Sequence, residues 1–191
     1  MLLLPVLFLA EKNIKSRIRI LLIPVLVFAV QFIPYMADRN LFDALFTYTK
    51  HWAFNGSVFN VAVLISNDNQ TARIICGVLL AASLTVLYGR EMSVFDGLFF
   101  AVFLLLLFSP VVHPWYVAWL AVLIPFSRRW SGIVFTAVIS LTGFTFISFQ
   151  TAGVWREYPA VLLIEYLPVI GLLIYELVNL NRLNVQKFDR F

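Results

Sequence analysis

The chain has 191 residues, of which 62% are hydrophobic and 13% are charged, and its mean hydropathy is +0.92. Soluble domains contain about 45–50% apolar and about 25% charged residues, so this composition excludes a water-soluble enzyme. The net charge of +4 does not indicate nucleic-acid binding, because the basic residues lie at the ends of apolar runs. The single cysteine, Cys76, excludes an internal disulfide, and no Cys/His spacing suggests a metal site.

Uncharged apolar runs predict an all-α, polytopic transmembrane helical bundle that forms one transmembrane domain over residues 1–191. A membrane-crossing helix needs about 20 residues. In chain order we expect an N-terminal half-span at residues 1–10 and then six spans, at 20–37, 74–89, 94–110, 115–127, 131–150 and 160–179.

The half-span at residues 1–10 would form only about 15 Å of helix, half the thickness of a membrane. It has neither a basic segment nor a small-residue cleavage site, so it does not resemble a signal peptide. We therefore expect the chain to be the C-terminal part of a larger membrane protein.

The segment 38–73 is the longest connection between spans. Its residues Leu41, Phe42, Leu45 and Phe46 share one helical face, which predicts a helix lying in the membrane interface. The aromatic side chains that follow, including Trp52, have two interpretations, as anchors of the interfacial aromatic belt or as a sugar-stacking surface. Residues 58–65 are apolar but too short to span, so they are expected to be re-entrant or to pack under the loop.

The apolar run 97–127 has 31 residues, and as one helix it would measure about 46 Å, well beyond a hydrocarbon core of about 30 Å. Pro110 and Pro114 lie in its middle and disfavour a continuous helix. We therefore expect two short spans joined by a tight turn that contains His113.

The distribution of lysine and arginine supports this division. With two spans, ten basic residues fall on one side of the membrane and four on the other, whereas a single span would give six and eight. The ten-to-four distribution is the more asymmetric one, and the side with ten basic residues is expected to be cytoplasmic. It therefore predicts a cytoplasmic C-terminus and a non-cytoplasmic His113.

Several polar residues have both a functional and a structural interpretation. His113 could donate a hydrogen bond to a phosphate, or it could simply belong to a wet turn. Glu165 and Glu176 are acids within a span, which is a functional hypothesis by default, although Glu176 could also extend to the headgroups. Asp96 is expected to cap a helix. Arg156 could bind a phosphate or form a surface pair with its neighbour Glu157.

Two stretches resemble a known family. They are Trp52-Ala53-Phe54-Asn55-Gly56-Ser57 and the run from Phe108 to Trp119, which includes Ser109-Pro110-Val111-Val112-His113-Pro114-Trp115-Tyr116. Over residues 20–180 the chain resembles the C-terminal half of bacterial polytopic glycosyltransferases of the GT-C superfamily. The closest likeness is to the branch of mannosyltransferase-like enzymes that depend on polyprenol phosphate.

The resemblance implies an integral protein of the bacterial inner membrane that transfers a hexosyl or mannosyl group on the outer membrane face. The donor would be a polyprenyl-phosphate sugar and the acceptor a hydroxyl of a glycan or lipid. By position, the resemblance implies substrate binding by Trp52, Asn55, His113, Trp115 and Tyr116. The family's catalytic acid lies in a first outer loop that this chain does not contain, so the general base is expected outside it. No cofactor and no metal are implied.

Two alternative functions for the chain stay open. One is a polytopic transporter or flippase, and the other is a non-catalytic membrane subunit.

Overall fold

A computed structural model describes residues 4–36, 42–153 and 157–179, and every regular element in these ranges is a helix. Packing divides the chain into two compact units, residues 1–111 and 112–191, which are described separately. The prediction of a single domain stays a prediction.

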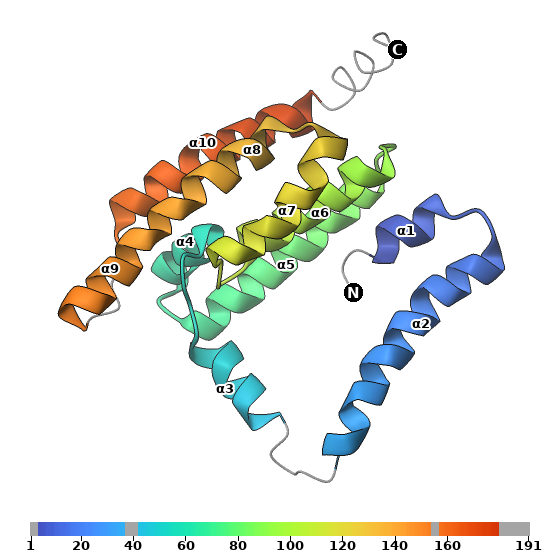
Figure 1. Ribbon diagram of the computed structural model, residues 1–191, viewed down its shortest axis with the longest axis horizontal. Coiled ribbons are helices and arrows are strands. Elements are labelled where there is room, and N and C mark those ends of the chain that lie inside the picture. The colour runs from blue at the N-terminus through green and yellow to red at the C-terminus, as the bar shows by residue number, and fades with distance from the viewer. Residues whose placement is uncertain (1–3, 37–41, 154–156, 180–191) are drawn as a thin grey trace. The chain divides into compact units, whose positions relative to one another are not determined.

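In its described residues, the first unit contains six α-helices and one 3₁₀ helix (Figure 1). They are α1 (Leu4–Ala10), α2 (Ile14–Phe32), η1 (Ile33–Tyr35), α3 (Asp43–His51), α4 (Ser57–Ser66), α5 (Asn69–Tyr88) and α6 (Val94–Phe108). The helices α5 and α6 run side by side and α4 packs against both, so these three form the centre of the unit.

The second unit contains α7 (Pro114–Ser127), α8 (Trp130–Val138), η2 (Ile139–Thr142), α9 (Gly143–Ala152) and α10 (Pro159–Val178). The helix α10 lies along α8 and η2, and α7 packs against α8 and η2 as well (Figure 1). The segment expected to be a span at 131–150 is helical, as α8, η2 and α9, with a 3₁₀ turn in its middle.

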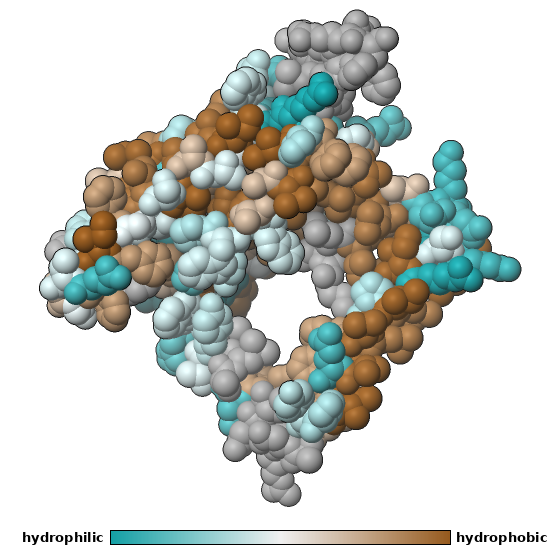
Figure 2. Space-filling model, in the orientation of Figure 1, coloured by the Kyte–Doolittle hydropathy of each residue, from teal (hydrophilic) through white to brown (hydrophobic). Residues whose placement is uncertain are grey.

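Within the part of the chain that the structure describes, four helical segments are long and apolar enough to cross a membrane: Ile14–Tyr35, Asn69–Tyr88, Trp130–Ala152 and Pro159–Val178. Many of their side chains are exposed apolar groups, and in Figure 2 such groups cover much of the visible surface of α2. α2 buries none of its residues. Outward-facing apolar surface on long helices is typical of proteins that lie in lipid.

The predicted break in the run 97–127 is confirmed. α6 ends at Phe108, the chain is not helical through His113, and α7 begins at Pro114 with proline at its first helical position. The two helices have 15 and 14 residues, or about 22 and 21 Å, which is short for a membrane span. The number of six spans therefore stays a prediction.

Local signals account for several helix starts. The Asp68 side chain accepts a hydrogen bond from the backbone N–H of Thr71 and caps α5. Ser93 and Asp96 form a reciprocal cap at α6: Ser93 Oγ donates to Asp96 Oδ2 over 2.8 Å, and the backbone N–H of Asp96 donates to Ser93 Oγ over 3.1 Å. The sequence predicted Asp96 as a cap, and it serves as one together with Ser93.

The connection 38–73 contains the expected helix as α3, and the short apolar run 58–65 forms α4. Leu41 and the side chain of Leu45 lie outside the described part of the chain, but Phe42 and Phe46 are 45% and 64% exposed. α3 thus presents aromatic groups outward, as an interfacial helix would. α4 does not stand alone, because Phe59 and Ala62 pack with Ala72 and Cys76 of α5 in a small buried cluster.

Candidate functional site

The two stretches that carry the family resemblance meet in the first unit. The backbone N–H of Phe54 donates to the carbonyl of Pro110 over 2.9 Å, and Phe54 and Val111 form an isolated parallel β-bridge. Phe54 is only 1% exposed. Because Pro110 stops α6, its carbonyl is available to an extended neighbour, so the same proline that ends the helix also supplies the acceptor.

Two serines strengthen this junction. Ser57 Oγ donates to the carbonyl of Leu107 over 2.8 Å, which satisfies an acceptor near the end of α6. Ser109 Oγ donates to the carbonyl of Val111 over 2.7 Å and accepts from the Val111 N–H over 3.2 Å, so it holds the turn in place. Both serines belong to the quoted stretches, and both act on backbone groups.

Asn55 and Gly56 shape the same junction through the backbone. Asn55 has φ = +53°, a left-handed conformation that asparagine tolerates better than most residues, and it is 2% exposed. At Gly56, an added Cβ would lie 3.0 Å from Phe59 Cβ and 3.1 Å from the carbonyl oxygen of Ser109. The Asn-Gly pair therefore permits a close approach that larger residues would prevent.

Trp52 precedes this junction and remains accessible. Its ring stacks on Tyr48 with centroids 5.8 Å apart and planes inclined by 17°, and it is 46% exposed. Arg73 of α5 donates from Nη2 to the Trp52 carbonyl over 2.7 Å. Its guanidinium also lies 5.3 Å from the ring centre of Phe59. An exposed pair of aromatic rings on an anchored backbone fits both sequence interpretations, the belt anchor and the sugar-stacking surface.

A second group of rings lies at the start of the second unit. His113 stacks on Trp115 with centroids 4.3 Å apart and planes inclined by 13°, and it meets Tyr116 edge-on at 5.3 Å. The carbonyl of His113 accepts from the Tyr116 N–H over 2.9 Å, as expected for the residue that caps α7. Trp115 is 58% exposed whereas His113 is 9% exposed.

Burial restricts the protonation of His113. Burial lowers the pKa of this imidazole from its ordinary value of 6.5. A neutral imidazole has one N–H donor and one acceptor, so this side chain can donate one hydrogen bond without carrying charge.

The candidate residues therefore fall into two groups. Trp52 and Asn55 lie on one segment of the first unit, and His113, Trp115 and Tyr116 form one ring cluster in the second unit. Arg156 lies outside the described residues.

Sequence reasoning missed a buried polar contact in the second unit. The carboxylate of Glu176 accepts from the Ser131 backbone N–H over 3.1 Å and from Ser131 Oγ over 2.5 Å. Glu176 is 3% exposed, so of its two interpretations the extension to the headgroups is not what the structure shows. The carboxylate sits instead at the N-terminus of α8, where backbone N–H groups and the helix dipole favour negative charge.

Glu165 and Glu176 lie eleven residues apart on α10, close to three full turns, so both point from the same face of the helix. Glu165 is completely buried, at 0% exposure. Their spacing was visible in the sequence and would have predicted a shared buried face. Among the described residues, no three His, Cys, Asp or Glu side chains gather closely enough to hold a metal ion.

These elements define the class, a helical protein whose described residues include four segments able to cross a membrane. Comparison of the chain with protein-family models, with curated proteins and with solved structures gives no match.

Proposed function

We propose that this chain is part of a membrane glycosyltransferase that moves a hexosyl or mannosyl group from a polyprenyl-phosphate donor to an acceptor hydroxyl on the outer membrane face. The supporting observation is that the two resembling stretches, far apart in sequence, are tied together by the Phe54–Pro110 hydrogen bond and the Ser57–Leu107 hydrogen bond. If both stretches contribute to one substrate site, their contact has a functional reason, which is why this observation supports the proposal.

In this proposal the aromatic residues bind the donor. Trp115 is largely exposed and stacked on His113, so its outer face is open to a sugar ring or a polyprenyl chain. His113 donates a hydrogen bond to the donor's phosphate, and its neutral form suits a site that must release the lipid phosphate afterwards. Trp52 and Asn55 contribute to substrate binding.

The test is sugar transfer from a polyprenyl-phosphate donor in membranes that carry the native protein. His113→Ala is expected to lower turnover about 100- to 1,000-fold, the usual effect of removing one preorganised donor to a developing charge. His113→Gln, which keeps an N–H donor, should lose less. Trp119→Ala is the matched control, because Trp119 is an exposed aromatic residue of the same helix α7. Near-normal turnover of His113→Ala at low donor concentration would remove His113 from the site.

A transporter remains the second candidate because of one observation, the two buried acids on one face of α10. Ionisable groups inside membrane bundles commonly mark paths for protons or ions. Glu165→Gln should abolish solute or proton flux in reconstituted vesicles if this candidate is right, and it should leave sugar transfer essentially unchanged if the glycosyltransferase proposal is right. Flux without any sugar transfer by the native protein would reverse the ranking.

A further inference from the structure

Basic residues are concentrated at the corner where α1 ends and α2 begins. Four cations occur close together in the sequence there, Lys12, Lys15, Arg17 and Arg19. Glu11 is the one acid in the first 37 residues of the sequence, so the corner carries a clear excess of positive charge. In Figure 2 hydrophilic residues gather at this corner, and apolar residues cover much of α2 beyond it.

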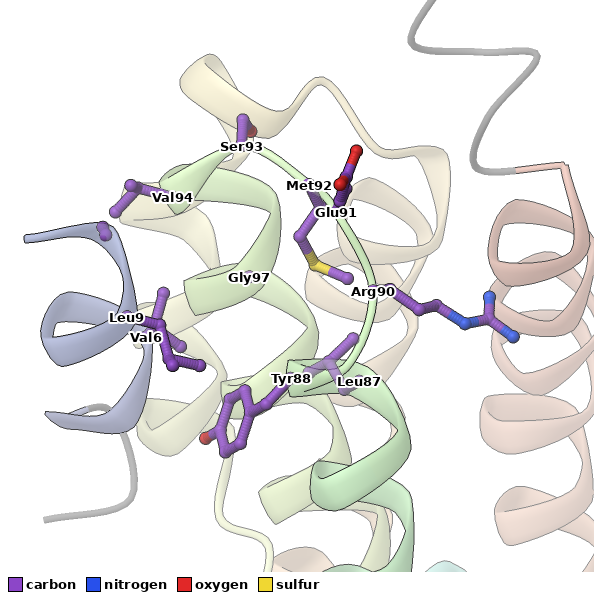
Figure 3. Close-up of a pocket in the computed structure, with 11 residues that line it drawn as sticks. Val6, Leu9, Leu87, Tyr88, Arg90, Glu91, Met92, Ser93, Val94 and Gly97 are labelled. Carbon is purple, nitrogen blue, oxygen red and sulfur yellow. The ribbon is translucent and has the colours of Figure 1, made fainter.

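One of the four cations braces the corner itself. α1 packs on α6 through Val6, which is 8% exposed and lies where an added Cβ on Gly97 would be 3.0 Å from its Cγ1 (Figure 3). Arg17 then ties α2 back to α1. Its Nε donates to the Glu11 carbonyl over 2.7 Å, and its guanidinium lies 5.1 Å from the ring centre of Phe8. Arg17 is therefore engaged within the protein.

The remaining three cations, Lys12, Lys15 and Arg19, are exposed. Lys15 and Arg19 are four residues apart, so they are neighbours on adjacent turns of one face of α2. Leu22 and Leu26 continue this face and are 52% and 58% exposed. The face defined by these four residues of α2 thus presents two cations, followed by apolar side chains over the next two turns.

The same face runs from headgroup depth into the hydrocarbon. α2 belongs to the segment Ile14–Tyr35, which is long and apolar enough to cross a bilayer, and it buries none of its residues. Cations at the start of such a segment lie among the headgroups, and the leucines that follow lie among the acyl chains. Clusters of lysine and arginine directly beside a membrane-crossing helix attract anionic lipids.

We propose that this face of α2 binds one anionic glycerophospholipid, whose phosphodiester lies between Lys15 and Arg19 and whose acyl chain lies along Leu22 and Leu26. The order of groups along the face is the order of groups in the lipid. The proposal is independent of the glycosyltransferase function, because it concerns other residues and does not require sugar transfer.

The charges of the corner favour an anionic headgroup over a zwitterionic one. The ammonium group of a zwitterionic lipid would be repelled by Lys12, Lys15 and Arg19. The nearby acid does not offset this repulsion fully, because Glu11 Oε1 already accepts a hydrogen bond from the Asn13 N–H over 2.8 Å. Phosphatidylglycerol has no ammonium group and is therefore the probe that suits this site.

The test is native mass spectrometry of the purified full protein, delipidated in detergent and titrated with phosphatidylglycerol or phosphatidylcholine of identical chains. The wild type should retain phosphatidylglycerol preferentially. Lys15→Gln and Arg19→Gln should each weaken retention of phosphatidylglycerol about fivefold, the usual effect of one basic residue near a lipid surface. Neither variant should change retention of phosphatidylcholine.

Lys50→Gln is the matched control, because Lys50 is an exposed lysine on a different helix, α3. It should retain phosphatidylglycerol as the wild type does. Equal retention of the two lipids by the wild type, or a loss in Lys50→Gln equal to that in Lys15→Gln, would overturn the proposal.

A double variant separates the position of the cation from the net charge of the corner. Ile14→Lys combined with Lys15→Gln keeps the net charge but moves the lysine by about 100° around α2. Ile14 is 63% exposed, so a lysine fits there. Retention of phosphatidylglycerol should stay as weak as in Lys15→Gln. Full recovery would mean that net charge alone attracts the lipid, and the assigned face would be wrong.

Discussion

Asn55 and Gly56 are adjacent, yet they contribute differently to the junction between residues 54–57 and 107–111. Asn55 turns the backbone through a left-handed conformation, whereas Gly56 has an ordinary φ of −77° and matters because of the space around it. Its effect is therefore steric, and a side chain as small as a methyl group is enough to test it.

Gly56→Ala is expected to destabilise the first unit by about 1–3 kcal/mol, since the new methyl group would overpack against Phe59 and the Ser109 carbonyl. The midpoint of SDS-induced unfolding measures the change. Gly77→Ala in α5 is the control, because an added Cβ there meets no atom within 4 Å, and alanine favours helix over glycine by about 0.5–1 kcal/mol. Equal losses in the two variants would show that Gly56 is not tightly packed.

The stability of the second unit should depend on pH through His113. Its pKa in the folded protein is lowered by burial, so between pH 6.5 and that lower value the unfolded chain binds a proton that the folded chain does not. Stability is therefore constant above about pH 6.5, falls as the pH falls from there to the folded pKa, and levels off below the folded pKa. Unfolding midpoints from pH 8 to pH 5 should show this loss in the wild type and a smaller loss in His113→Gln. Identical pH profiles would contradict it.

At the scale of single elements, α8 and α10 are joined by both packing and a buried polar contact. Apolar contacts such as that between Phe135 and Tyr166, with ring centroids 5.6 Å apart, hold the helices together. The hydrogen bonds from Ser131 to Glu176 fix how far one helix can slide along the other, because only one register satisfies the carboxylate.

Glu176→Ala and Ser131→Ala are each expected to lower the stability of this helix pair, and the double variant should lose less than the sum of the two. A coupling energy of about 0.5–3 kcal/mol is usual for residues in one hydrogen-bonded network. Unfolding in SDS measures the three changes. Ser140→Ala is the control, since Ser140 is exposed and its hydroxyl donates to the carbonyl of the nearby Ala137 rather than to another helix. Strict additivity would mean that the contact does not stabilise the pair.

Helix positions were largely predictable from the sequence, and contacts between helices were not. Pro110 and Pro114 predicted the break between α6 and α7 because proline acts on its own backbone and that of its neighbours. The Phe54–Val111 bridge and the Ser131–Glu176 contact join residues far apart in sequence, and no local pattern specifies which partner each will find. Trp115 and Tyr116 lie within three residues of His113, so their clustering could be anticipated.

For the whole molecule, the basic residues predict an orientation that labelling can test. In a Cys76→Ser background, Trp115→Cys should react with a membrane-impermeant maleimide from outside the cell, whereas Arg128→Cys should react only after permeabilisation. Both positions are exposed, and α7 lies between them. Reaction of both from the same side would mean that α7 does not cross the membrane, and the six-span arrangement would be wrong.

The Phe54–Val111 bridge also bears on how the protein is made. Residue 111 is both the end of the bridge and the last residue of the first unit, so this unit is complete as soon as Val111 leaves the ribosome. At about 5–20 residues per second, Phe54 must wait about 3–11 seconds for its partner. During that interval α4, α5 and α6 are synthesised in turn, before the bridge can form. Because α7 begins only at Pro114, the bridge can close before α7 has left the ribosome, so closing the first unit requires no residue of the second.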